Sequence, residues 1–209
     1  MKREKLHKVI VEDLSHLGEG IAKVDGFPLF IPSSIPGDEV EVEVISMRKN
    51  FGLAAIKQII TPSPHRVHPR CDKFGTCGGC QTMSLDYATQ LTFKEKRVKD
   101  SLQRIGKINT PVSSIIGMND PWFYRNKAQF PIGMNKNKLD IGFFRQGSHD
   151  IVDSNKCYIQ HPIIDKTRSV LREFITKHDI TVYDEATGKG LIRHLVTKVG
   201  FATGEVMVI

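Results

Sequence analysis

The stretch Glu39-Val40-Glu41-Val42-Glu43-Val44-Ile45 decides the fold of the first part of the chain. Its glutamates and valines alternate with a period of two, so one face of the segment is apolar and the other is charged. Successive side chains of a strand point to opposite sides of a sheet, and this pattern is typical of such a strand. The sequence therefore predicts a half-buried strand over residues 39–45.

Other short strand patterns flank this segment on both sides. They cover residues 8–12, 21–24, 27–31 and 54–60. The pair Asp25-Gly26 separates two of them and is a strong hairpin signal. About five short strands within about sixty residues are typical of a small closed barrel of the OB type. We therefore predict a first domain over residues 1–62, which ends at the proline-rich linker Thr61-Pro-Ser-Pro64, and a second domain over residues 63–209.

The second domain mixes helix and strand patterns, so the predicted fold class is mainly β with α+β elements. A long helix is expected over residues 84–105, with Ser84 as its N-cap and Gly106 at its C-terminal end. A second helix is expected over residues 162–177. The predicted strands cover residues 127–132, 140–144, 190–199 and 205–209. Because the last of these strands is the second strand of a hairpin and is cut off at Ile209, we expect the sequence to be part of a longer protein.

The four cysteines are arranged as three plus one. Cys71, Cys77 and Cys80 lie within ten residues of one another, whereas Cys157 lies far downstream. Four thiolates can close a tetrahedral zinc site, but such sites use paired cysteine knuckles that this spacing lacks. A four-thiolate iron–sulfur cluster suits the spacing at least as well, and four unrelated buried thiols are the remaining alternative. We predict that all four cysteines are metal ligands, and we expect the nearby His65 and His68 to be surface residues.

The composition favours a polyanionic partner. The 209 residues carry a net charge of +7, and 40% of them are hydrophobic, which is enough for a core. A positive excess suits nucleic acid, although ordinary solubility charge is the simpler alternative. No long apolar run and no secretory leader follow the charged N-terminus. We therefore expect a cytoplasmic protein without a membrane partner, in which the cysteines stay reduced.

Three clusters of cationic residues, two of which include aromatic residues, are candidate RNA contacts. Cations can hold phosphates while an aromatic ring stacks on a base. Solvent-exposed turns and strand edges are the simpler alternative, with Phe51 packed into the barrel. The candidates are Arg48, Lys49, Phe51, Arg125, Lys127, Arg193 and Lys198.

The sequence offers no catalytic machinery of its own. It contains no glycine-rich dinucleotide loop, no P-loop and no HExxH motif. All four cysteines are assigned to the metal centre, so none remains as a nucleophile.

The order of these motifs resembles the RNA (uracil-5-)-methyltransferases that carry a TRAM domain and an iron–sulfur cluster, of the 23S ribosomal RNA type. The resemblance runs through essentially the whole chain. The residues that carry it are Cys71-x5-Cys77-Gly-Gly-Cys80-Gln81, Tyr124-Arg-Asn-Lys127, Gly142-Phe-Phe-Arg145, Asp150-Ile-Val-Asp153, Cys157 and Arg193-His194 followed by Thr203-Gly204-Glu205.

The resemblance implies that the barrel is an RNA-binding TRAM domain. It also implies that a β-rich central domain holds a four-iron, four-sulfur cluster on Cys71, Cys77, Cys80 and Cys157. In this family a Rossmann-like domain binds S-adenosylmethionine, and its catalytic cysteine attacks C6 of a flipped uracil so that C5 accepts the methyl group. These parts would lie beyond Ile209. We therefore expect no catalytic and no S-adenosylmethionine-binding residue in this stretch, and no activity from it alone.

We accordingly predict the RNA-recognition and cluster-binding part of an S-adenosylmethionine-dependent methyltransferase that acts on C5 of uridine. Ribosomal RNA is the preferred substrate and transfer RNA the alternative. The resemblance further implies that the helix over residues 84–105 packs on the absent catalytic domain and that the full-length protein is a monomer. The rival hypothesis, from a different functional class, is a non-catalytic RNA-binding protein with a structural zinc site.

Overall fold

The computed structural model describes residues 6–209; the charged residues 1–5, which begin the predicted first domain, lie outside the described part. The chain divides into two compact units. The first consists of Met1–Pro69 and Gln81–Met118, and the second of Arg70–Cys80 and Asn119–Ile209. The expected boundary at residues 62 and 63 would place residues 63–118 in the second domain. In the structure most of that segment groups with the barrel, and only the cysteine loop belongs to the second unit.

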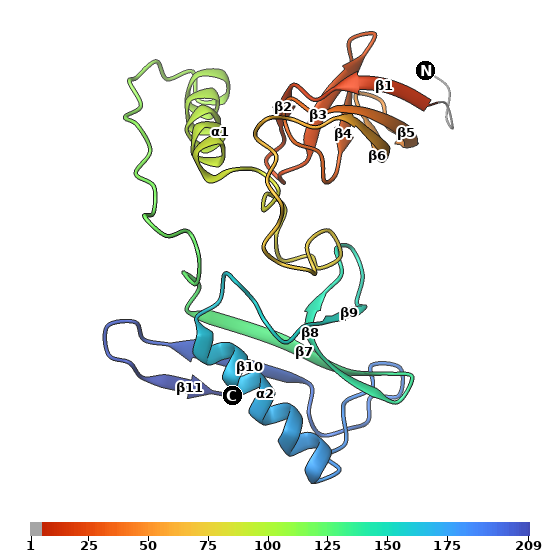
Figure 1. The fold of residues 1–209 in the computed structure, drawn as a ribbon, viewed down its shortest axis with the longest axis vertical. Helices are drawn as coiled ribbons and strands as arrows, with labels where there is room; N and C mark the ends of the chain where they lie inside the picture. The colour runs from red at the N-terminus through yellow and green to blue at the C-terminus, as the bar shows by residue number, and fades with distance from the viewer. Residues whose placement is uncertain (1–5) are drawn as a thin grey trace. The chain divides into compact units, whose positions relative to one another are not determined.

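The first unit contains a six-stranded sheet with the order β1-β5-β6-β4-β3-β2 (Figure 1). Its strands are β1 (Leu6–Ile10), β2 (Asp13–Leu14), β3 (Gly20–Val24), β4 (Phe27–Ile31), β5 (Glu39–Met47) and β6 (Gly52–Thr61). β1 pairs with β5, and the chain then continues into β2, which pairs with β3. Between these strands the Glu12 backbone N–H donates to the Ile21 carbonyl at 2.8 Å. This bent segment joins the two edges of the sheet, so the predicted small barrel is present.

The alternating segment behaves as its pattern predicts. Val40, Val42 and Val44 are at most 1% exposed, and they pack with Leu29 and Ile31 in the core of the barrel. The glutamates of β5 lie on the other face, where Glu43 pairs with Lys57. Burial of the valines on one face therefore fixes the register of β5, because a shift by one residue would bring the glutamates into the core.

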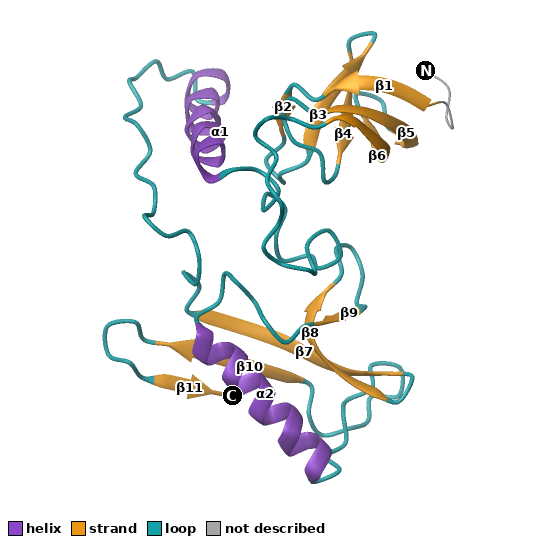
Figure 2. Cartoon of the chain, in the orientation of Figure 1, coloured by secondary structure: helices purple, strands orange, loops and turns teal. Residues whose placement is uncertain are grey.

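The predicted long helix is shorter than expected and starts later. The α-helix α1 spans Tyr87–Asp100, and a π-helical turn, η1, follows over Ser101–Ile105 (Figure 2). The N-cap is Asp86, whose carboxylate accepts the Thr89 N–H at 2.9 Å, so the predicted cap at Ser84 is wrong. Ser84 is instead a buried residue. No residue of α1 or η1 is buried, and Ile105 is 82% exposed.

The second unit contains a five-stranded sheet with the order β11-β10-β7-β8-β9. The strands are β7 (Lys127–Asn135), β8 (Lys138–Phe144), β9 (Ile151–Asp153), β10 (His194–Val199) and β11 (Val206–Val208). The predicted strand over residues 190–199 is thus too long, because residues 190–193 precede β10. β2 and β9 were not predicted.

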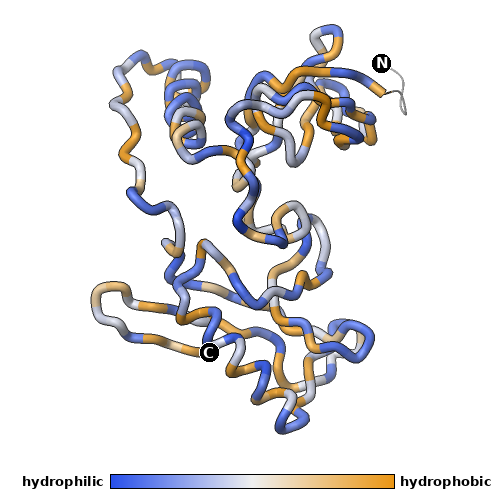
Figure 3. Tube along the Cα trace, viewed as in Figure 1, coloured by the Kyte–Doolittle hydropathy of each residue, from blue (hydrophilic) through white to orange (hydrophobic). Residues whose placement is uncertain are grey.

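Helix α2 (Pro162–Lys177) covers one face of this sheet, and its predicted bounds are confirmed. Ile164 and Ile175 of α2 pack with Phe130 of β7 and Leu195 of β10 in a single core. Figure 3 shows hydrophobic and hydrophilic residues alternating along the helix, as one buried and one solvated face require. None of the helices within residues 6–209 is long and apolar enough to span a membrane.

Candidate metal centre and nucleic-acid interface

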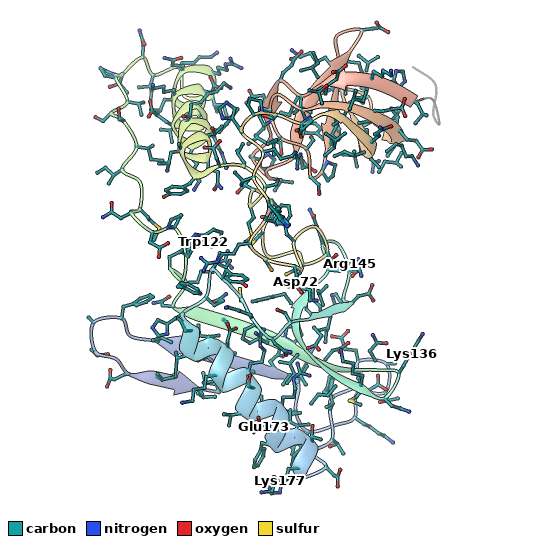
Figure 4. The ribbon with its side chains drawn as sticks, in the orientation of Figure 1. Asp72, Trp122, Lys136, Arg145, Glu173 and Lys177 are labelled. Carbon is teal, nitrogen blue, oxygen red and sulfur yellow. The ribbon has the colours of Figure 1, made fainter. Side chains whose placement is uncertain are left out.

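The cysteine loop is a series of turns held by its own backbone and by β8. The Cys77 N–H donates to the Lys73 carbonyl at 2.8 Å, and the Gly78 N–H donates to the Phe144 carbonyl at 2.9 Å. A Cβ on Gly78 would lie 3.0 Å from that same carbonyl oxygen, so glycine allows this close approach. The loop is thereby fixed to the end of β8, next to Arg145 (Figure 4).

Cys157 lies in a second loop that pairs with the segment before β7. The Phe123 N–H donates to the Tyr158 carbonyl at 2.9 Å, and the Arg125 N–H donates to the Ile159 carbonyl at 2.8 Å. The second unit thus contains all four predicted ligands, and each of them is a half-buried free cysteine.

The four thiols influence one another electrostatically. Burial and the nearby Cys157, Cys77 and Cys71 thiols raise the pKa of Cys80 to about 11. Burial also raises the pKa of Cys77 and of Cys157. Metal ligation requires the thiolate form, so in this environment the positive charge of a metal centre would have to offset the cost of burial.

The chemistry of the donor set fits a thiolate-ligated centre. Backbone N–H groups point at the sulfurs: Gly79 donates to the Cys77 Sγ at 3.4 Å, and Ile159 and Gln160 donate to the Cys157 thiol. The Arg125 cation favours the thiolate form of Cys80. Within residues 6–209, the structure contains no group of three or more His, Cys, Asp or Glu side chains, the four cysteines included, whose arrangement could hold a metal ion as it stands.

An aromatic cage surrounds Arg70, directly before the first cysteine. Its guanidinium lies 5.1 Å from the ring centroid of Trp122, 5.6 Å from that of Phe123 and 4.8 Å from that of Tyr158. Phe123 adopts the left-handed backbone region with φ of 54°, which is strained for an aromatic residue. The cage links the loop of Cys71 to that of Cys157. Sequence analysis missed it, although three consecutive aromatic residues at 122–124 were a visible signal.

An ion pair between the buried Arg168 and the partly buried Asp165 lies next to Cys157. The Arg168 NH2 group donates to the Asp165 Oδ1 at 2.7 Å, and the Cys157 N–H donates to the Asp165 Oδ2 at 3.1 Å. Burial raises the pKa of Asp165 and lowers the pKa of Arg168, so desolvation outweighs the attraction within the pair. Sequence analysis also missed these two residues.

The sheet face opposite α2 carries a pair of cations. Lys127 on β7 and Lys198 on β10 are register partners, and both side chains are exposed. Their neighbours Ala128 and Thr197 point to the other face and are buried. Like charges directly opposite each other destabilise a sheet. A polyanionic partner would neutralise the repulsion between these two lysines, so the pair favours such a partner.

The remaining predicted RNA contacts occupy different settings. Arg48 and Lys49 are exposed in the loop before β6, whereas the Phe51 ring packs edge-on against Phe30 with 5.3 Å between centroids. Phe51 is thus packed against the barrel, as the simpler alternative to RNA binding expected. Stacking of Phe51 on an RNA base stays a prediction. Arg125 is exposed near Cys80.

Arg193 is exposed but already engaged. Its guanidinium pairs with Glu185 at 3.5 Å and covers the Tyr183 ring at 4.7 Å. It lies at the rim of a cavity of about 760 Å³ that Phe144 and His149 also line. The expected surface positions of His65 and His68 are confirmed, and the His65 ring lies 3.1 Å from Asp86 at the start of α1.

Comparison with known proteins identifies the barrel. Residues 5–57 match the TRAM domain family. Over its full 209 residues the chain is 41% identical to a protein of Clostridium tetani named "uncharacterized RNA methyltransferase" and covers 45% of that protein. A similarly named protein of Caldanaerobacter subterraneus is 44% identical over 203 residues, which are 97% of this chain and 45% of the relative. The chain therefore spans about half the length of the curated relatives it matches.

A solved structure is similar along nearly the whole chain. The Pyrococcus abyssi tRNA (uracil-54, C5)-methyltransferase, in complex with S-adenosyl-L-homocysteine, matches with a TM-score of 0.69 and 28% identity. The match covers 96% of this chain and 44% of that enzyme. The chain thus consists of a TRAM domain and a second, mainly β unit, and its homologues along the whole length are proteins named RNA methyltransferases.

Proposed function

We propose that this chain is the RNA-recognition and cluster-binding part of an S-adenosylmethionine-dependent methyltransferase that methylates C5 of uridine in RNA in the cytoplasm. The observation that carries the proposal is the structural similarity to a uracil C5 methyltransferase over 96% of the chain. The relatives named RNA methyltransferases support the same class of reaction.

In this proposal the two units have separate tasks. The TRAM barrel binds RNA through its exposed loop with Arg48 and Lys49. In the second unit the lysine pair of β7 and β10 holds the phosphate backbone. Methyl transfer belongs to the part of the full-length protein outside this chain, so we expect residues 1–209 alone to be inactive.

The second unit holds a four-iron, four-sulfur cluster on Cys71, Cys77, Cys80 and Cys157. Four thiolates leave no open iron position for a substrate, so the cluster is a structural link between two loops. The N–H donors aimed at Cys77 and Cys157 support thiolate ligation at both ends of this link.

Two RNA classes are candidate substrates. The cysteine motifs resemble enzymes of the 23S ribosomal RNA type, and ribosomal RNA is our first choice. Transfer RNA is the second candidate, because the similar P. abyssi enzyme acts on uracil 54 of tRNA.

Methylation mapping in cells that lack the full-length gene tests the proposal and separates these substrates. We expect one or more 5-methyluridines to disappear from 23S ribosomal RNA and to return when the gene is restored. Loss from transfer RNA alone would select the second candidate. An unchanged 5-methyluridine content in both RNA classes would contradict the proposed reaction.

Replacing both Lys127 and Lys198 with glutamine is expected to weaken binding to structured RNAs of any sequence. The slope of log K against log salt concentration should fall by about 1 for each phosphate that a lysine no longer neutralises. Because the two like charges oppose each other, the free energy of unfolding should stay unchanged or rise slightly. Filter binding over a salt series measures the affinity, and thermal unfolding checks the fold.

Lys177→Gln is the matched control for this prediction. It removes one lysine charge, rather than two, from the last turn of α2 (Figure 4), the helix that covers the other face of the sheet. If the salt dependence of RNA binding is the same in the double variant as in the wild type, this face of the sheet does not contact RNA.

A further inference from the structure

We propose that Arg168, acting through Asp165, is a positioning residue for the metal centre: it fixes the loop of Cys157 and supplies a buried positive charge beside the thiolates. The inference rests on the proposed function insofar as it requires a thiolate-ligated cluster. It assigns a role to two residues of α2 that are not themselves ligands.

A relay of two hydrogen bonds through Asp165 connects Arg168 to the backbone of Cys157, the proposed ligand that lies far from the other three in the sequence. Asp165 lies in the first turn of α2, and its Oδ2 accepts the Cys157 N–H at 3.1 Å. Its Oδ1 accepts from the Arg168 NH2 group at 2.7 Å, one helical turn further on. A carboxylate held on both oxygens cannot rotate freely, so the relay fixes the backbone of Cys157 relative to the rigid helix.

Arg168 is too poorly paired to be an ordinary core ion pair. The residue is 1% exposed, and within the described part of the chain its Nε and NH1 have no hydrogen-bond partner. The guanidinium carbon also lies over the Phe130 ring, 4.7 Å from its centroid. A buried guanidinium normally needs most of its donors satisfied, which leaves room for a further anionic partner.

The thiolate centre provides that anionic charge. In its thiolate form Cys157 would attract Arg168 electrostatically, as the Asp153 carboxylate does. Asp153 is already bound by Arg172 and by Lys138. Four thiolates outweigh the positive charge of a cluster core, so the assembled centre is an anion that compensates Arg168.

A second buried polar side chain is found at the same ligand. Gln160 is 1% exposed, its backbone N–H donates to the Cys157 thiol, and its Oε1 has no partner among the described residues. Gln160 in the loop of Cys157 and Arg168 on α2 are thus two buried polar side chains without a full set of hydrogen-bond partners. In a core without a cofactor, each of these unpartnered polar groups would lower stability. Beside a charged cluster, the same groups can orient the ligands and interact with the charge of the cluster.

The test compares Arg168→Met with Arg172→Met in the anaerobically purified chain. Arg172 lies one turn further along α2 and binds Asp153 and the Leu139 carbonyl, so its removal also costs an ion pair but leaves Asp165 and Cys157 untouched. We expect Arg168→Met to release iron to a chelator in air at least tenfold faster than the wild type. Arg172→Met should release iron within about twofold of the wild-type rate.

The reduction potential gives an independent readout. Removing a positive charge disfavours the more negative, reduced cluster. A tenfold shift of the equilibrium toward the oxidised form corresponds to about 59 mV for one electron. Arg168→Lys keeps the charge but not the planar fork, so it should restore the potential while iron loss stays faster than in the wild type.

The outcomes separate this inference from the proposed function. Equal iron release and equal potentials in the two methionine variants would overturn the inference while leaving the cluster in place. Wild-type protein without iron and sulfide would overturn the cluster itself. If Arg168→Met does not fold, the rates of iron release from Asp165→Ala and Asp165→Asn are compared instead. Only asparagine can still accept the Cys157 N–H, so equal iron release from both would contradict the relay.

Discussion

Replacing any one of Cys71, Cys77, Cys80 or Cys157 with serine is expected to abolish cluster binding, from about four iron atoms per chain to below about one. The chain contains these four cysteines and no other, so no spare thiol can take over the lost position. The effect should be as large for Cys157 as for the clustered three, because the centre joins two separate loops. Iron and sulfide analysis of protein prepared without air measures it.

Thr76→Ala is the control, since it alters the same loop without removing a thiol. It should retain iron and sulfide at the wild-type level. Stoichiometric zinc without sulfide in the wild-type chain would instead contradict the cluster and favour the structural zinc site of the rival hypothesis.

Replacing Asp38 with alanine is expected to lower the free energy of unfolding of the barrel by about 3–5 kcal/mol. Its side chain is fully buried and accepts from the Ile35 N–H at 2.8 Å and the Ser63 N–H at 2.9 Å. It also receives two donors from Arg66, one of them Nε at 3.0 Å. Alanine would leave all these groups, including a mostly buried cation, without their acceptor. Hydrogen exchange of the β5 and β6 amides measures the loss within the barrel.

The same residue predicts an acid limit for the barrel. Burial alone would raise the pKa of Asp38, but the hydrogen bonds from Arg66, Ser63 and Ile35 outweigh it and hold the pKa below its ordinary value of 3.8. Stability from this group is therefore fully present above pH 3.8 and is lost as the pH falls through the lower folded-state pKa. Asp38→Ala should remove this part of the pH dependence.

Glu12→Ala is the matched control for Asp38. Glu12 pairs with Lys23 at 3.3 Å, and both side chains are about half exposed. Such a surface pair contributes at most about 1 kcal/mol, so the barrel of this variant should unfold nearly as the wild type does. Equal losses for Asp38→Ala and Glu12→Ala would refute the buried-acceptor argument.

The elements that were predictable from sequence are those in which local pattern and burial agree. β5 follows its Glu-Val alternation, and α2 has Pro162 in its first turn and an amphipathic pattern up to Lys177. The start of α1 was misassigned because Ser84 and Asp86 are both good caps. Only the three-dimensional packing shows that Ser84 is buried and that Asp86 faces the Thr89 N–H.

Cysteine spacing alone singled out the four proposed metal ligands, and their ligand role stays a prediction. The residues that surround these cysteines in the structure could not be predicted in the same way. Arg168 gave no such signal. Its spacing of four residues from Ile164 places it on the buried face of α2, but a long cationic side chain at such a position is normally expected to extend its charge to solvent. Short strands such as β9 have too few residues for a period-two pattern and depend on pairing with β8.

The discontinuous second unit has a consequence for biosynthesis. Its cysteine loop is separated from the rest of the unit by Gln81–Met118, which belong to the first unit. During translation Cys80 leaves the ribosome well before Cys157, and at typical elongation rates the delay is roughly 4–15 s. Throughout that interval the three free thiols are present without Cys157, the proposed fourth ligand, and they can be oxidised or can bind another metal. Delivery of the proposed cluster would therefore be a late step, timed by completion of the second unit rather than by synthesis of the loop that supplies three of the four proposed ligands.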